Sequence, residues 1–170
     1  MTRRDFILKW LLYAAALLPV LALELYVFPR FPIFGLIPSL LPMAAVIVAM
    51  LEGPVAGLGF GLFVGILHDA FIPGVPGVII VGMTLLGGAA GTLSRYGVQK
   101  NILGCLAGCA GTLGIIGIVR ILYHLLRGTA SLWRLLAVAL PEIVLSLVFL
   151  PLIYGIFLWV HRRVPQVSLL

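Results

Sequence analysis

The chain has 170 residues, of which 63% are hydrophobic and 9% are charged, and its formal net charge is +6. This composition excludes an ordinary soluble domain, in which about a quarter of the residues are charged. Because Lys and Arg stand at the ends of apolar runs and not along one face, the positive charge indicates membrane topology and no nucleic-acid partner.

The apolar runs predict helices that cross a lipid bilayer. Only helices and closed barrels satisfy the backbone in lipid, and the runs lack the alternating polar residues of a barrel wall. A helix needs about 20 apolar residues to cross the hydrocarbon core. We therefore expect an all-α, polytopic membrane helical bundle, a single transmembrane domain over residues 1–170, with six spans at about 6–28, 36–51, 54–72, 77–94, 102–126 and 133–160.

The first two spans are delimited by prolines. The apolar run of residues 6–28 is too long for a signal peptide and no small-residue cleavage site follows it, so we expect a retained span. It ends where Pro29 and Pro32 disfavour a continuing helix. The second span carries Pro38 and Pro42 near its start, where missing amide donors cost least.

The third span carries a strip of small residues. Four residues exceed one helical turn of 3.6 residues by only about 40°, so positions spaced by four wind slowly along one side of a helix. Small residues at this spacing let helices approach closely in lipid. The strip predicts a groove for a partner's transmembrane helix, and the alternative is packing within the bundle. It consists of Gly53, Gly57, Gly61 and Gly65, with Asp69 at the next step.

The same spacing returns in the fourth and fifth spans, at Gly87 and Gly91 and at Gly104 and Gly108. A Pro-Gly turn at residues 73–77 separates the third span from the fourth.

Ionisable side chains from three spans are expected at one level near the outer surface. With a rise of 1.5 Å per residue, these side chains lie roughly 24 to 27 Å from the inner boundary of their spans, and His124 lies one helical turn further out. Charges at such depth are normally paired or face water. We expect Arg120 to pair with Asp69 or Glu24 and to close the outer end of the bundle; the alternative is separate snorkelling to the headgroups. This outer polar layer consists of Glu24, His68, Asp69, Arg120 and His124.

The last span is interrupted by Pro141 and Pro151. A proline removes one backbone hydrogen bond, so Pro141 and the adjacent Glu142 predict a kink site nearer the middle of the membrane. A proton or ion relay is an alternative use of such a pair. In the fifth span, Cys105 and Cys109 lie one turn apart and are expected to be inert packing residues.

Enzymatic chemistry has little support in the sequence. His68 and Asp69 are adjacent, so their side chains diverge by roughly 100° on a helix and cannot form a dyad with each other. Ser94 lacks the strand-to-helix setting of a nucleophile, and we find no phosphate-binding or metal-binding motif. We therefore expect a non-enzymatic protein without cofactor or metal.

Orientation follows from the basic residues, because positive charge is retained on the cytoplasmic side. With both termini inside, the inner segments hold Arg3, Arg4, Lys9, Arg95, Lys100, Arg162 and Arg163, whereas the outer loops hold Arg30, Arg127 and Arg134. This asymmetry predicts that both chain ends lie in the cytoplasm.

Several of these features together resemble a known family. The proline-bearing stretch PSLLPMAAVIVAMLEG is followed by GPVAGLGFGLFVGILHDAF, then by PGVPG and a glycine-rich fourth span. This order is similar to that of the rod-shape-determining membrane protein family MreD. His68 stands where an apolar residue is commoner, and the turn is short and proline-rich. The resemblance rests most sharply on Gly57, Phe60, Gly61, Gly65 and Asp69, with Gly77 as the turn glycine.

The resemblance implies a component of the bacterial cell-elongation complex in the cytoplasmic membrane. Its partners would be the bitopic coiled-coil protein MreC and, indirectly, the peptidoglycan polymerase-transpeptidase pair and the actin-like MreB. It also implies a fold similar to the substrate-binding subunits of energy-coupling-factor transporters. The alternative function is therefore a subunit that binds a vitamin-like solute in the outer layer, with Tyr26, Tyr123 or Trp133 as stacking groups.

Overall fold

The computed structural model describes residues 3–31, 35–71, 77–96, 102–128 and 132–163. Within these ranges the regular structure is helical, which confirms the predicted all-α class. The first helix is continuous through a π-helical turn, because α1 (Arg3–Ala22), η1 (Leu23–Val27) and α2 (Phe28–Arg30) follow one another without a break. The others are α3 (Leu41–Glu52), α4 (Pro54–Phe71), α5 (Val78–Tyr96), α6 (Ile102–Leu126) and α7 (Leu132–Arg163).

Among the described residues, five helical segments are long and apolar enough to cross a membrane, and α3 is a shorter apolar helix. The chain is therefore a polytopic membrane protein. The predicted boundaries of the long spans agree with the structure to within three residues. Residue 72, most of the predicted Pro-Gly turn and the polar link after α5 lie outside the described residues. The long segments are Ile7–Arg30, Pro54–Phe71, Val78–Arg95, Ile102–Leu126 and Leu132–Arg163.

The second predicted span, residues 36–51, is wrong at its start. The helix begins only at Leu41, with Pro42 in its first turn. Pro38 disfavours helical conformation in the residue before it. The backbone N–H groups of Leu40 and Leu41 are instead bonded to the carboxylate of Glu24, at 2.9 and 2.7 Å. The chain therefore enters the bundle as a segment without regular helix and becomes helical only at Leu41, which is buried.

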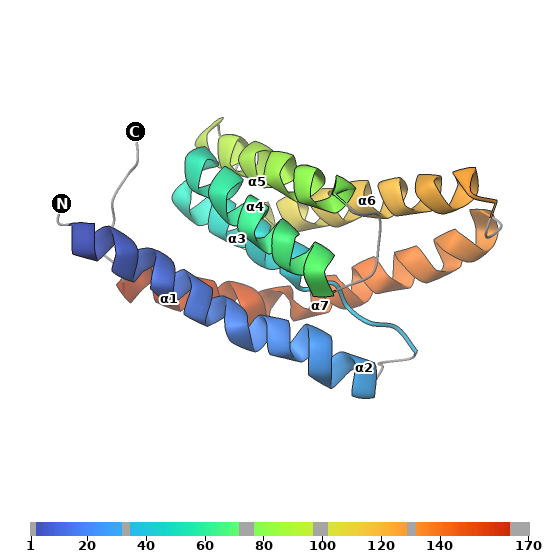
Figure 1. Ribbon diagram of the computed structural model, residues 1–170, viewed down its shortest axis with the longest axis horizontal. Coiled ribbons are helices and arrows are strands. Elements are labelled where there is room, and N and C mark those ends of the chain that lie inside the picture. Colours follow the sequence, from blue (N-terminus) through green and yellow to red (C-terminus); the bar gives the residue numbers. More distant parts are fainter. Residues whose placement is uncertain (1–2, 32–34, 72–76, 97–101, 129–131, 164–170) are drawn as a thin grey trace.

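Helix α3 is the centre of the bundle. Every side chain from Leu41 to Leu51 is buried, as expected for a helix that is hydrophobic all round. It is surrounded by α1, α4, α5, α6 and α7, and α4 and α5 lie side by side (Figure 1). The start of α1 and the end of α7 lie at the same end of the molecule (Figure 1). We call this the inner end, and the opposite end, where α6 ends and α7 begins, the outer end.

The glycine strip of α4 faces α5. A Cβ atom on Gly57 would lie 2.4 Å from the carbonyl oxygen of Gly87, and one on Gly61 would lie 2.5 Å from that of Met83. Gly65 would meet the α5 backbone at 2.9 Å. The prediction that this strip receives a partner's helix is therefore wrong, because the chain's own α5 already fills it.

Gly53 belongs to a turn and not to the packed strip. It ends α3 with φ 102°, a conformation in which a side chain is strained. Its N–H donates to the carbonyl of Ala49 at 2.8 Å. Close by, a Cβ on Gly91 would lie 2.6 Å from the backbone of Pro54, so α5 contacts the α3–α4 turn as closely as it contacts α4.

Candidate functional site

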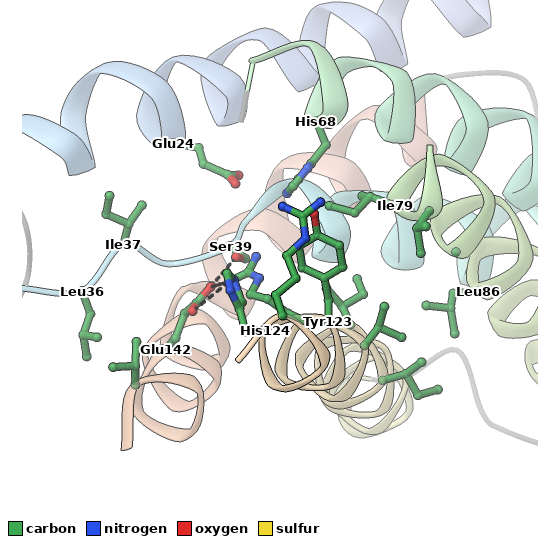
Figure 2. A pocket seen from close by; sticks show the side chains of 18 of the residues that line it. Glu24, Leu36, Ile37, Ser39, His68, Ile79, Leu86, Tyr123, His124 and Glu142 are labelled. Atoms are coloured by element: carbon green, nitrogen blue, oxygen red, sulfur yellow. Dashed lines mark hydrogen bonds and ion pairs between the residues drawn. The ribbon is translucent and has the colours of Figure 1, made fainter. Parts of the chain in front are cut away.

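A cavity of about 670 Å³ lies at the outer end and is bordered by residues of η1, α4, α5, α6 and α7 and of the segment that precedes α3. We call it the outer cavity. Four of the five residues of the predicted outer polar layer line it. The polar or aromatic lining residues are Glu24, Ser39, His68, Arg120, Tyr123, His124, Arg127 and Glu142 (Figure 2).

Arg120 is paired with Glu142, which the sequence did not suggest. Its Nη1 donates to both carboxylate oxygens at 3.1 Å, and the hydroxyl of Ser39 donates to one of them at 2.8 Å. The expected pairing of Arg120 with Asp69 or Glu24 is therefore wrong. Glu142 therefore belongs to the outer cavity together with Arg120 and is not a separate site.

Pro141 does not interrupt α7. The helix continues through both Pro141 and Pro151 and curves along the bundle (Figure 1). The predicted kink site therefore lies within one continuous helix, and the carboxylate of Glu142 is bonded to Arg120 and Ser39.

Glu24 is buried at the start of α3. Only 3% of it is exposed, and its Oε2 accepts the N–H groups of Leu40 and Leu41. A carboxylate in this position satisfies amides that have no partner within the helix and interacts favourably with the positive end of the helix dipole. The π-helical turn that carries Glu24 alters the spacing of side chains along the first helix, as such turns often do at functional sites.

His68 is the buried polar group of the cavity that has no hydrogen-bond partner at one ring nitrogen. Only 2% of the residue is exposed, and its Nδ1 has no partner among the described residues. Figure 2 shows His68 and Glu24 pointing into the same space from opposite sides. Buried polar atoms are almost always bonded, so an unbonded ring nitrogen on a side chain that points into a cavity is a candidate contact for a ligand atom.

Of the other predicted residues, Tyr123 lines the cavity, whereas Asp69, Tyr26 and Trp133 do not. Asp69 does not line the cavity, and its carboxylate accepts the N–H of Gly77 at 3.2 Å. Of the three proposed stacking groups, Tyr123 lines the cavity, with the guanidinium of Arg127 4.5 Å from its ring centre. Tyr26 and Trp133 are 75% and 81% exposed and face outward from the bundle.

A second polar group, at the inner end, was missed by the sequence analysis. Glu52 forms an ion pair with Lys9, accepts the hydroxyl of Tyr13 at 2.6 Å and lies 3.0 Å from Nδ1 of His161. Lys9 is 5% exposed and Tyr13 fully buried. We call these four residues the inner cluster. Lys9 lies inside an apolar run and not before it, which is the one sequence signal that could have suggested a buried partner.

The part of the chain that the structure describes contains no metal-binding arrangement of side chains. No group of three or more His, Cys, Asp or Glu residues there could hold a metal ion. Cys105 and Cys109 are both buried and free.

The pairing of Arg120 with Glu142 gives a direct test. Arg120→Gln should lower the free energy of unfolding by about 1 to 2 kcal/mol, because a partly exposed charged hydrogen-bonded pair is lost. The swap of Arg120→Glu with Glu142→Arg should recover part of what either reversal costs, as measured by thermal unfolding in detergent. The stability changes caused by Asp69→Asn and Arg120→Gln should simply add in the double variant. A strong coupling energy between these two substitutions would instead support the pairing of Arg120 with Asp69 that the structure contradicts.

The helices and the outer cavity define the class: a polytopic membrane protein with a largely apolar cavity, lined in part by polar side chains, at one end of the bundle. Comparison with protein-family models, with curated proteins and with solved structures found no match to this chain.

Proposed function

We propose that the chain is a non-enzymatic scaffold of the bacterial cell-elongation complex, placed in the cytoplasmic membrane with both ends in the cytoplasm. In this role it holds an MreC-like single-span coiled-coil protein. Through that partner it is linked to the peptidoglycan polymerase-transpeptidase pair and to MreB, and so maintains cell shape.

The observation that supports this proposal is the α4–α5 hairpin. Most of the residues on which the resemblance to the MreD family rests most sharply hold α4 and α5 together. Three glycines let α5 approach the α4 backbone, and Asp69 bonds the amide of Gly77 at the start of α5. Phe60 packs between α1 and α7, with ring centres 6.3 Å from Tyr13 and 6.2 Å from Phe157. The residues of the motif therefore each make a specific packing or hydrogen-bonding contact, which a merely glycine-rich composition would not provide.

The partner must bind elsewhere than on the glycine strip, since α5 occupies it. The long helices expose apolar side chains, and helix association in lipid depends on packing of such surfaces. A single-span partner can therefore bind without displacing any helix of this chain.

Co-purification tests the proposal. The chain, expressed with an MreC-like single-span protein, should retain it through detergent extraction, and deletion of the gene should make rod-shaped cells round. Normal rod shape after deletion, together with no complex after cross-linking in membranes, would contradict the scaffold.

A second candidate is a binding subunit for a vitamin-like solute, and the outer cavity is the observation that favours it. Its volume suits a small molecule, and α3 begins at the cavity, as interrupted helices do at transporter binding sites. Selective thermal stabilisation by one member of a vitamin panel, with capture of an ATPase module, would support this candidate over the scaffold.

A further inference from the structure

The outer cavity continues as a groove between α5 and α6. A smaller cavity of about 240 Å³ lies further towards the inner end, and its lining shares Leu86 and Ile115 with that of the outer cavity. The inner part is lined by small residues such as Ala107 and Gly111, and a Cβ on Gly111 would meet nothing within 4 Å. The two cavities therefore adjoin at Leu86 and Ile115, and we call them together the α5–α6 groove.

The apolar walls of the groove are open on one side. Val78, Leu93 and Ile115 are 46%, 53% and 48% exposed, although α5 and α6 both belong to candidate membrane spans. Apolar walls exposed within a membrane span are in contact with lipid chains. The long dimension of the groove therefore suits a hydrocarbon chain that enters sideways from the bilayer.

The polar end of the groove favours an anion. Its two carboxylates are already engaged, Glu24 by the amides at the start of α3 and Glu142 by Arg120 and Ser39. The guanidinium of Arg127 stacks on Tyr123 and is exposed. Arginine at such a position is well suited to a phosphate group.

His68 adds an independent sign of a ligand. Its Nδ1 is buried without a partner among the described residues, and the residue lines the cavity into which its side chain points (Figure 2). In the tautomer that carries a proton on Nδ1, it can donate to an ester or phosphate oxygen. A dry apolar chain alone would leave this nitrogen unsatisfied.

We propose that the α5–α6 groove binds one lipid with a net-negative phosphate headgroup. The phosphate lies at Arg127, His68 donates to an oxygen of the headgroup linkage, and a hydrocarbon chain runs along Ile115 towards Gly111. The proposal goes beyond the scaffold function and does not depend on it, since it concerns a ligand of this chain and not its protein partner.

Lipid binding by the purified full chain tests the proposal. Delipidated protein in detergent would be titrated with phosphatidylglycerol, and binding followed by thermal shift and by native mass spectrometry. His68→Leu and Arg127→Gln should each weaken binding about tenfold, the effect of one lost hydrogen bond to a charged group. Arg134→Gln is the matched control, because Arg134 is exposed and does not line the cavity.

Stability separates a ligand role of His68 from a structural one. Because its Nδ1 has no partner to lose, His68→Leu should leave the lipid-free protein as stable as the wild type, while about ten times more lipid is needed for the same stabilisation. A lipid-free His68→Leu protein that melts well below the wild type would overturn the proposal, as would equal lipid affinity in all variants. Equally tight binding of zwitterionic phosphatidylcholine, of glycerol phosphate or of a vitamin would also overturn it.

Discussion

Replacement of Gly57 or Gly61 by leucine is expected to abolish the folded protein. The Cβ atoms would lie 2.4 and 2.5 Å from carbonyl oxygens of α5, and a backbone carbonyl cannot rotate away as a side chain can. Overpacking by even small groups costs about 1 to 3 kcal/mol, and a leucine at this contact requires α4 and α5 to separate. Since total stability is only about 5 to 15 kcal/mol, the loss should be visible as aggregation after detergent extraction.

Gly59→Leu provides the matched control. Gly59 lies on the same helix, and a Cβ there would meet nothing within 4 Å. This variant should elute as a monodisperse species with the melting temperature of the wild type. If Gly57→Leu behaved in the same way as Gly59→Leu, the close contact of α4 with α5 would be wrong.

This result would also distinguish internal packing from partner binding. A groove that served only a partner would tolerate a leucine in the isolated chain and lose the partner. If α5 fills the groove, the leucine instead prevents this chain from folding. Co-purification experiments with variants of Gly61 or Gly65 therefore report on folding, and partner contacts should be tested on exposed faces.

The long spans could be predicted from sequence because lipid leaves few choices. Uninterrupted apolar runs of sufficient length must be helices, so α4, α6 and α7 were placed within three residues. The start of α3 was not, because its N-terminal amides are satisfied by Glu24, which is 16 residues away from Leu40 in sequence. No local pattern reveals a cap that comes from another helix.

The sequence predicted which side chains of the candidate site lie at the same level along the helices, but not which side chains bind each other. Counting residues along a span gives the level of a side chain, and Glu24, His68, Arg120 and His124 do share one cavity. It does not give the face of the helix on which a partner lies, so Arg120 was assigned to the wrong carboxylate. The glycine spacing likewise indicated a close approach without indicating which helix approaches.

Glu52→Ala is expected to have the second large effect, a loss of about 3 to 5 kcal/mol, because removing one partner of a buried ion pair leaves the other charge uncompensated. Here Lys9 would remain at 5% exposure, and the hydroxyl of Tyr13 would lose its acceptor at 2.6 Å. The melting temperature in detergent should fall accordingly. The effect should exceed that of Arg120→Gln, since the Arg120 side chain is 39% exposed and water can replace its partner.

The double variant Lys9→Met with Glu52→Leu decides whether buried charge is the cause. Replacement of a buried ion pair by apolar residues of similar volume is often neutral. Tyr13 and His161 would retain each other, because the hydroxyl and Nδ1 are 3.1 Å apart. The double variant should therefore be more stable than Glu52→Ala alone. If the double variant instead lost the sum of the stabilities lost by Lys9→Met and Glu52→Leu alone, Lys9 would reach water without Glu52. The inner cluster would then join α1, α3 and α7 by packing and not by charge.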